Sequence, residues 1–478
     1  HPDESIYFNA IPVDSRKDTG LFYNAIYQIF TYVSFTNEVL QARFASVFLG
    51  SIFLLFTLLS AYQLKLDKYK IFIIYIVILF SYQSIFLFER IRPEISWWCL
   101  ASVFVYLVIL LEKYKSNKYF IFLLIISFLL PMNHQLSLIF CIFACGYIVL
   151  FLRIQIGITK TLLIILFFLF GIFFNFFVSG LMTTGFSLGH ILNSFNSSSN
   201  GPSQSISKFF SLVFFESPLF LNDFANNKNF YELIFGFDKK WLSHAFIQNL
   251  FWLLMFLTPF LLKGLKQKYI LSFPLYCFIF FYFSGYYNPT YSAAFSIISL
   301  LLFFIAIVEK NKYVYFIAYV ILIVSIFNGL SFLSTRILSH GKTNYFEVEE
   351  FLSNYLDKNN QHIFKASIPE RFLPLKKNRD HQFYINFKND LPTDLDVLIY
   401  DDYDFLMYKF VPDYEGKLSQ IKNISMQMCL DKKLTLPVYK NDNLFPWYEH
   451  NQYMKNFSNE NIIPIDSNLI NGSWFYRN

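Results

Sequence analysis

Charged residues are scarce in this chain of 478 residues. Only 15% of the residues are Asp, Glu, Lys or Arg, whereas a soluble globular domain carries about 25%. The composition therefore excludes an ordinary water-soluble globule. Aromatic residues make up 21% of the chain, with 63 Phe and 33 Tyr, which excludes an intrinsically disordered chain. One soluble core would not bury so much apolar surface, so the composition predicts a polytopic membrane protein.

Cysteine is also rare, with five residues in the whole chain. Four of them (Cys99, Cys141, Cys145 and Cys277) fall in apolar stretches, and Cys429 stands alone in the polar C-terminal region. A disulfide within that region is therefore excluded. The sequence has no CxxC pair and no Cys/His spacing of a metal site, so we expect no metal. The net charge of +6 comes from scattered basic residues, which does not indicate nucleic-acid binding.

Long apolar runs are the main feature of the first 333 residues. A helix needs about 20 apolar residues to cross the bilayer. On this measure we expect ten membrane spans, near 44–64, 71–87, 95–112, 119–132, 136–152, 160–180, 247–262, 269–285, 291–308 and 313–333. Helices are expected, because an open strand edge leaves backbone groups unpaired in lipid. The runs 119–132 and 136–152 are short and meet at Pro131, so a single bent or re-entrant pair is an alternative there.

Basic residues occupy alternate loops between these spans. They are Lys65, Lys68 and Lys70; Lys113, Lys115 and Lys118; Arg153 and Lys160; Lys263, Lys266 and Lys268; and Lys310 and Lys312. The positive-inside rule places these loops in the cytoplasm. The other segments are then expected to face outward: 1–43, 88–94, 131–135, 181–246, 285–290 and the tail from 334.

The sequence predicts two domains. Residues 1–333 form a transmembrane domain with a long outward loop at 181–246, and residues 334–478 form a small extracytoplasmic α/β domain. In the latter, a helical pattern at 345–356 precedes strand-like runs such as 395–400. No hydrophobic segment precedes the outward residues 1–43, so we expect either a membrane helix upstream or a removed signal peptide; the resemblance described below favours the helix.

Polar residues gather beside membrane boundaries on the predicted outward side. They are Asp3 and Glu4; Glu38 and Arg43; Glu89, Arg90, Arg92 and Glu94; His134 in Asn133-His134-Gln135; and the stretch 285–291. Such a set suits a lipid-linked phosphosugar, whose phosphate lies at headgroup depth. Arginine binds phosphate oxygens bidentately, and a carboxylate serves as general base toward an acceptor hydroxyl. The sequence therefore favours Asp3 or Glu4 as base and Arg90 or Arg92 as phosphate ligand.

Each of these residues also has a purely structural interpretation. Arg90 and Arg92 suit a helix end that is anchored at the membrane surface. The acidic pair Asp3-Glu4 suits a solvated surface. Glu38 with Arg43 suits an ordinary pair within one helix, and His134 a polar residue at a helix turn. The functional interpretation gains weight because all these residues share one predicted side of the membrane.

The order of these motifs resembles the GT-C glycosyltransferases, specifically the protein O-mannosyltransferase and aminoarabinose transferase group, which is family 39-like. The motifs are Asp3-Glu4, then Glu38 with Arg43-Phe44-Ala45-Ser46, then the segment 89–94. The resemblance covers about residues 1–333 and is strongest in the first hundred. It departs from the family at Asn288-Pro289, where relatives often carry a basic residue followed by tyrosine.

The resemblance implies a GT-C-like helical bundle that transfers a sugar from a polyprenyl-phosphate donor. The acceptor is a lipid, glycan or protein on the outer face of the membrane. The catalytic residues implied are Asp3 as general base and Glu4 beside it. The substrate-binding residues implied are Glu38, Arg43, Glu89, Arg90, Arg92, Glu94 and His134. The resemblance implies no metal and no cofactor besides the lipid-linked co-substrate, and membrane lipids but no nucleic acid as further partners.

Two other functions stay open at this point. A membrane transporter or flippase of lipid-linked sugars usually has ionisable residues deep inside its spans and paired broken helices, whereas the spans here are nearly free of charge. An assembly protein with a partner-binding tail is the third hypothesis. The tail contains three glycosylation triplets, which begin at Asn423, Asn456 and Asn471.

Overall fold

The computed structural model describes residues 21–31, 38–80, 94–133, 137–183, 257–262, 264–284 and 289–306, with six single positions between 316 and 330 and five strands between 363 and 477. Two compact units divide the chain. The unit Ala10–Phe332 contains the described helices, and the strands belong to the other unit. The boundary predicted at 333 and the helix predicted at 345–356 lie outside the described residues.

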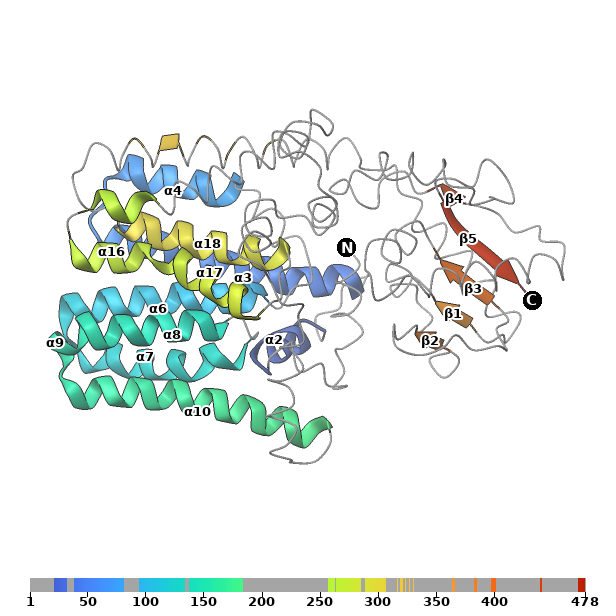
Figure 1. Cartoon of the computed structure of the whole chain (residues 1–478), viewed down its shortest axis with the longest axis horizontal. Coiled ribbons are helices and arrows are strands. Elements are labelled where there is room, and N and C mark those ends of the chain that lie inside the picture. Colours follow the sequence, from blue (N-terminus) through green and yellow to red (C-terminus); the bar gives the residue numbers. More distant parts are fainter. Residues whose placement is uncertain are drawn as a thin grey trace. The chain divides into compact units, whose positions relative to one another are not determined.

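The helical unit is a bundle (Figure 1). Its elements are α2 Leu21–Thr31, α3 Glu38–Gln63, α4 Lys68–Phe80, α6 Glu94–Tyr114, α7 Asn117–Leu129, the 3-10 turn η1 Leu130–Met132, α8 Ser137–Tyr147, the π-helical turn η2 Ile148–Leu152, α9 Arg153–Ile156, α10 Ile158–Thr183, α16 Leu265–Leu271, α17 Phe273–Ser284 and α18 Pro289–Ala306. Four stretches are long and apolar enough to cross a membrane: Arg43–Gln63, Glu94–Tyr114, Ser137–Ile156 and Ile158–Asn175. The described part of the chain is thus mostly helical and compatible with a multi-pass membrane protein.

Several predicted spans coincide with these helices. The predictions 44–64, 95–112, 160–180 and 291–308 match α3, α6, α10 and α18. The predicted span 71–87 corresponds to α4, of which the described part ends at Phe80. The predicted spans 247–262 and 313–333 lie mostly outside the described residues.

Two predicted spans differ from the structure. The predicted span 136–152 is longer in the structure, because α8 continues through η2 and α9 to Ile156. The helical stretch Ser137–Ile156 has 20 residues, a length that favours a separate crossing over a re-entrant pair. The predicted span 269–285 is wrong as a single helix, because it divides at Ser272 into α16 and α17. Pro274 in the first turn of α17 explains the break, since its ring has no N–H for a bond to the preceding turn.

Helix α6 is the central element of the bundle. Within its apolar window 83% of the residues are buried, against 22% in α10. The core is aromatic: the Phe140 ring of α8 lies 6.4 Å from Trp97 and 6.0 Å from Phe104, both on α6, and 6.0 Å from Phe273 of α17. The ring of Phe53 on α3 lies 6.0 Å from Trp98. Aromatic packing therefore joins α6 directly to α3 and α8, and Phe140 extends the cluster to α17.

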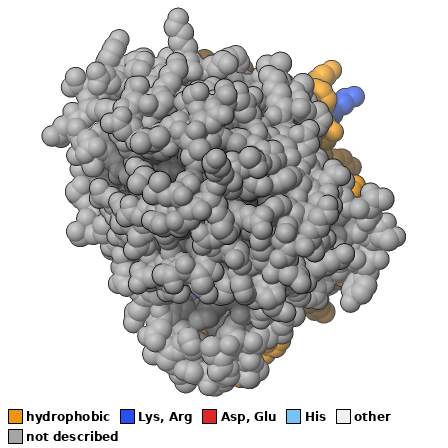
Figure 2. Space-filling model, turned by 90° about the vertical axis from the view of Figure 1, so that its right-hand side faces the viewer, with side chains coloured by type: hydrophobic (Ala, Val, Ile, Leu, Met, Phe, Trp, Pro, Cys, Tyr) orange, Lys and Arg blue, Asp and Glu red, His pale blue; other side chains and the backbone are white. Residues whose placement is uncertain are grey.

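Helix α10 exposes one apolar stripe. Its exposed large apolar side chains recur at helical spacing and are Ile158, Leu162, Leu163, Leu166, Leu169, Phe170 and Phe173. Elsewhere too, hydrophobic side chains predominate among the few described ones visible at the right-hand edge of the space-filling view, where a basic side chain lies with them (Figure 2). A contiguous apolar stripe is costly in water but matches a hydrocarbon surrounding. The stripe is therefore the expected lipid-facing surface of α10.

Short turns connect the helices at one end of the bundle. Between α3 and α4, Asp67 caps α4 by accepting the Lys70 backbone N–H at 2.9 Å, and this bond is the main cause that lowers the pKa of Asp67. Between α6 and α7, Ser116 caps α7 by accepting the N–H of Lys118 at 3.3 Å. Gly157 ends α9 at a φ of 84°, which favours glycine.

Side-chain hydrogen bonds bring these turns together. Lys113 Nζ donates to Gln63 Oε1 at 3.1 Å, and Lys160 Nζ donates to Asn117 Oδ1 at 2.7 Å. A third contact joins α16 to α6 and is described with the site below. We call this end of the bundle the basic end; it comprises residues 62–70, 112–118, 153–160 and 264–268. Four of the five basic loops predicted to share one side of the membrane thus lie together, while the side itself stays a prediction.

The strands of the second unit form a mixed sheet in the order β2-β1-β3-β5-β4. The strands are β1 Ile363–Lys365, β2 Gln382–Tyr384, β3 Val397–Tyr400, β4 Tyr439–Lys440 and β5 Gly472–Arg477. Strand β1 pairs in parallel with β2 and β3, and β5 pairs antiparallel with β3 and β4. Strand β3 lies within the predicted strand-like run 395–400.

Gly171 allows α10 to approach α7 closely. A Cβ atom at this position would collide with the backbone carbonyl of Phe128 and lie 2.7 Å from the ring of Pro131. We expect Gly171→Ala to lower the free energy of unfolding by about 1–3 kcal/mol, as overpacking does, although alanine is the better helix former. Thermal unfolding of the purified protein in detergent measures this. Leu169→Ala on the exposed stripe is the control, and equal melting temperatures for Gly171→Ala and wild type would contradict the packing.

Candidate functional site

The end of the bundle opposite the basic end carries the described part of the predicted site. Helices α3 and α6 both run toward the basic end, where Gln63 and Lys113 are hydrogen-bonded. Arg43 precedes Gln63 by 20 residues and Glu94 precedes Lys113 by 19. At a rise of 1.5 Å per residue, each lies about 30 Å from the basic end. Arg43 and Glu94 therefore occupy the same end of the bundle, as the predicted topology required.

A buried hydrogen bond joins the start of α6 to Asn133 of the predicted polar segment 133–135. Ser96 Oγ donates to Asn133 Oδ1 at 2.6 Å, which links the first turn of α6 to the end of η1. Asn133 Nδ2 donates to the carbonyls of Leu129 and Leu130, both at 3.0 Å. Pro131 ends the regular helix because it has no N–H, and the amide of Asn133 satisfies carbonyls that the ending helix leaves open. All polar atoms of the Asn133 side chain are thus engaged, which fixes its orientation.

Glu94 is the first residue of α6 and is fully buried, with 0% of its surface exposed. An acidic residue in the first turn of a helix gains about 0.3–1 kcal/mol from the helix dipole. Removing a carboxylate from water costs several kcal/mol before its partners offset it. Capping alone therefore does not account for a buried Glu94 beside Trp97 and Trp98. Buried ionisable residues of membrane proteins are usually functional.

Two hydroxyl groups at the same end are buried without a hydrogen-bond partner among the described residues. They belong to Ser46, three residues after Arg43 on α3, and Ser137, the first residue of α8, and both are 0% exposed. A buried polar group without a partner costs about 1–3 kcal/mol. Each hydroxyl is thus a buried polar atom that the described residues do not satisfy.

The structure places only part of the predicted site. Arg43 is half-buried on α3, and Glu94 is buried on α6. Glu38 begins α3, but its side chain is not among those described. The other predicted residues lie outside the described residues: Asp3, Glu4, Glu89, Arg90, Arg92 and His134. The Ser96–Asn133 bond places the residue before His134 beside α6, where the segment 89–94 ends.

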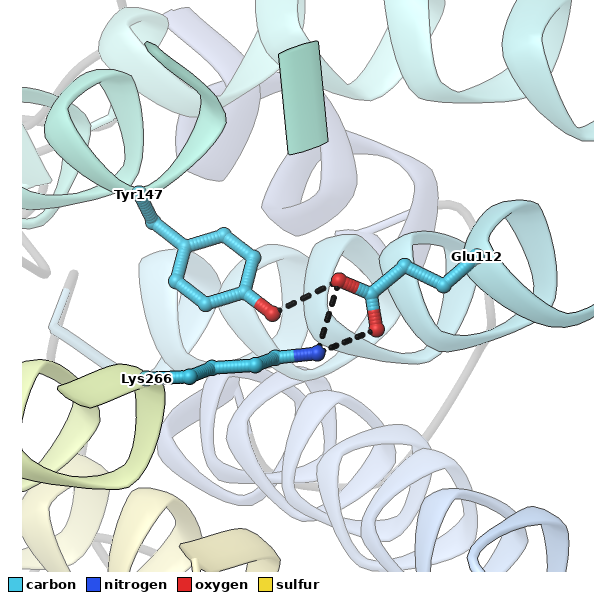
Figure 3. Close-up of polar contacts among 3 residues, drawn as sticks. All are labelled: Glu112, Tyr147 and Lys266. Carbon is cyan, nitrogen blue, oxygen red and sulfur yellow. Dashed lines mark hydrogen bonds and ion pairs between the residues drawn. The ribbon is translucent and has the colours of Figure 1, made fainter. Parts of the chain in front are cut away.

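A second polar cluster lies at the basic end (Figure 3). Lys266 Nζ of α16 lies 2.9 Å from Glu112 Oε1 and 2.7 Å from Glu112 Oε2 of α6, and Tyr147 of α8 donates its hydroxyl to Glu112 Oε1 at 2.7 Å. The ammonium also lies 5.6 Å from the centre of the Tyr147 ring. The side chains of Lys266 and Glu112 are 38% and 16% exposed. One carboxylate thus ties three helices together.

Tyr269 strengthens the same junction one turn further along α16. Its hydroxyl donates to the Phe143 carbonyl at 2.8 Å, and its ring stacks on Phe143 with centroids 5.0 Å apart. Gly146 makes room for it, because a Cβ there would collide with the Tyr269 hydroxyl. The π-helical turn Ile148–Leu152 follows directly. Such turns occur often at functional positions in helices.

The sequence interpretation missed this cluster. The available signal was Glu112, an acidic residue at the end of an apolar run and directly before the basic stretch 113–118. Its partner Lys266 lies 154 residues away in the sequence, so no local pattern pairs the two. Ser96 was missed as well, because a serine within an apolar helix usually bonds its own backbone.

Comparison with known proteins finds no matching family model, curated protein or solved structure. Within the described residues, no group of three or more His, Cys, Asp or Glu side chains is arranged to hold a metal ion.

Ser96→Ala should destabilise the protein by about 1 kcal/mol, because it leaves the buried Asn133 oxygen without its donor. The matched control is Ser102→Ala on the same helix. Ser102 is equally buried, but its hydroxyl bonds only the Cys99 carbonyl of its own helix at 2.7 Å. Thermal unfolding in detergent compares the two, and equal losses of stability would contradict a cross-linking role for Ser96.

The Glu112–Lys266 contact should show a coupling energy of about 1 kcal/mol in a double-mutant cycle of Glu112→Gln and Lys266→Met. The coupling should decrease with added salt only slightly, because Glu112 is mostly buried. The exposed pair Asp67–Lys70, at 3.2 Å, is the control and should show no measurable coupling. Additive effects of Glu112→Gln and Lys266→Met on thermal unfolding would show that the pair does not hold α16 in place.

Proposed function

We propose that this chain is a membrane glycosyltransferase that transfers a sugar from a polyprenyl-phosphate donor to an acceptor on the outer face of the membrane. The resemblance to the GT-C glycosyltransferases of the family 39-like group suggests this function. Its substrate-binding residues in this proposal are Glu38, Arg43, Glu89, Arg90, Arg92, Glu94 and His134, with Asp3 and Glu4 as catalytic residues.

The observation that carries the proposal is the buried Glu94 at the start of α6. Glu94 ends the motif of two carboxylates and two guanidiniums, and it is 0% exposed. Two residues later, Ser96 bonds Asn133, the neighbour of His134 in the sequence. The start of α6, where the segment 89–94 ends, is thus bonded to Asn133 of the predicted polar segment 133–135, which supports a common site.

The proposed reaction assigns a role to each group. A carboxylate of Asp3 takes the proton from an acceptor hydroxyl, whose oxygen forms a bond to the anomeric carbon of the sugar. The bond from that carbon to the phosphate oxygen breaks, and polyprenyl phosphate leaves with the bonding electrons. Arg90 and Arg92 stabilise the negative charge on the leaving phosphate. Glu94 and Arg43 position the groups around it.

The finer architecture belongs to the same proposal. The bundle is GT-C-like, and the tail is an extracytoplasmic α/β domain. Parallel strands need a crossover connection of about a dozen residues or more, and β1 and β2 are parallel with 16 residues between them. That spacing is sufficient for a helix between the strands, which supports the α/β class.

Asp3→Asn should abolish sugar transfer, because the amide takes up no proton from the acceptor. The assay supplies a polyprenyl-phosphate-linked hexose and host membranes as the acceptor source, and measures the polyprenyl phosphate released. Asp14→Asn makes the same chemical change 11 residues later and is the control. The variant should keep the wild-type melting temperature, and transfer at the wild-type rate would overturn the assignment.

A membrane transporter or flippase of lipid-linked sugars is the second candidate. The observations that favour it are the break at Ser272, the π-helical turn in the α8–α9 stretch, and the Glu112–Lys266 pair between them. Transporters often use broken helices and paired charges. However, Glu112 lies two residues from the end of α6, not near its middle. Liposomes separate the two functions, because a flippase moves labelled lipid-linked sugar between leaflets without releasing polyprenyl phosphate.

A further inference from the structure

The basic end gathers residues from four separate parts of the chain. Hydrogen bonds join Gln63 to Lys113 and Asn117 to Lys160, and the Glu112–Lys266 ion pair adds α16. Segments that are up to about 200 residues apart in the sequence therefore form one surface at the ends of α3, α6, α10 and α16. This surface belongs to the helical unit alone.

The charge of this surface is strongly one-sided. Its ten basic residues are Lys65, Lys68, Lys70, Lys113, Lys115, Lys118, Arg153, Lys160, Lys266 and Lys268. Its two acidic residues, Asp67 and Glu112, each already contact a lysine, at 3.2 Å from Lys70 and 2.7 Å from Lys266. No acidic side chain of the basic end thus remains to neutralise the other basic groups. Their counterion must come from outside the described part of the chain.

Exposed apolar and aromatic side chains accompany these charges. Tyr62, Tyr69 and Tyr114 are 67%, 75% and 51% exposed, and Ile154 and Leu265 are 81% and 74% exposed. Tyrosine beside lysine is typical of the headgroup layer of a membrane, where an aromatic body and a polar tip both find suitable surroundings. A soluble anionic partner such as a nucleic acid would leave these isoleucine and leucine side chains in water.

We propose that the basic end is a binding surface for anionic phospholipid headgroups. The lysines bind the phosphates, while the tyrosines and the apolar side chains lie in the interfacial layer beside them. Each lysine near an anionic bilayer surface strengthens binding by about fivefold. This inference does not depend on the sugar-transfer reaction, because it concerns the opposite end of the bundle from Glu94.

The test compares lipids of different headgroup on the purified full-length protein in detergent. Anionic phosphatidylglycerol should raise the melting temperature and remain bound in native mass spectrometry, whereas zwitterionic phosphatidylcholine should do neither. Raising the salt concentration to about 0.5 M should weaken the effect, because the charges are exposed. Equal effects of the two lipids would overturn the proposal, as would stabilisation by inorganic phosphate alone, or RNA that displaces phosphatidylglycerol.

Four exposed lysines provide the variant. Lys65, Lys115, Lys118 and Lys268 make no side-chain bond to a described residue, so their replacement by Gln should leave the melting temperature without lipid unchanged. Affinity for phosphatidylglycerol should fall at least roughly tenfold. The control replaces Lys376, Lys377, Lys432 and Lys433 of the tail by Gln, which removes the same charge. Unchanged phosphatidylglycerol affinity in the variant of the basic end would overturn the proposal. If that fourfold variant does not fold, the double variant Lys115→Gln with Lys118→Gln repeats the test.

Discussion

The enclosure of α6 by its neighbours is the constraint on which the helical unit depends. Its aromatic side chains pack against α3, α8 and α10, and most of its length is inaccessible to both water and lipid. A helix in this position has no surface on which a charge is solvated. Its Asp, Glu, Lys and Arg residues, which are Glu94, Glu112 and Lys113, therefore all lie within three residues of its ends. Both polar sites of the bundle follow from this arrangement.

The two ends of α6 are chemically different. At the basic end, Glu112 is partly exposed and directly bonded to Lys266 and Tyr147, an arrangement that holds helices together. At the other end, Glu94 is fully buried beside the Ser96–Asn133 bond, and the Ser46 and Ser137 hydroxyls have no hydrogen-bond partner in the described part of the chain. A carboxylate whose oxygens are bonded by neighbouring helices suits a structural role. Buried polar groups without such partners suit a binding site, and the proposed substrate-binding residues Arg43 and Glu94 lie at this end of the bundle.

Two glycines and a π-helical turn occur where helices of the bundle approach one another closely. Gly171 lets α10 approach the Phe128 carbonyl of α7, and Gly146 leaves room for the Tyr269 hydroxyl. Small residues at such contacts are typical of membrane helices, where apolar burial gives little driving force. The π-helical turn in the α8–α9 stretch, directly after the Tyr269 contact, departs from regular helix geometry. Irregular backbone thus occurs where α16 meets α8, while α10 stays regular and exposes its apolar stripe.

The sequence by itself determined the membrane class, the course of α3, α6, α10 and α18, and the alternation of basic loops, because hydrocarbon selects for length and apolarity along a single helix. Likewise, Ser116 caps the start of α7 and Pro131 ends its regular part, and both effects are local. Only the tertiary structure decided which polar residues meet. The pairs Ser96–Asn133 and Glu112–Lys266 join residues that are 37 and 154 positions apart. The burial of Glu94 likewise depends on neighbouring helices, whereas the break at Ser272 follows locally from Pro274. Local sequence patterns reflect whether a segment lies in lipid, in water or in the protein core, whereas the partner of a buried polar group depends on how distant helices pack.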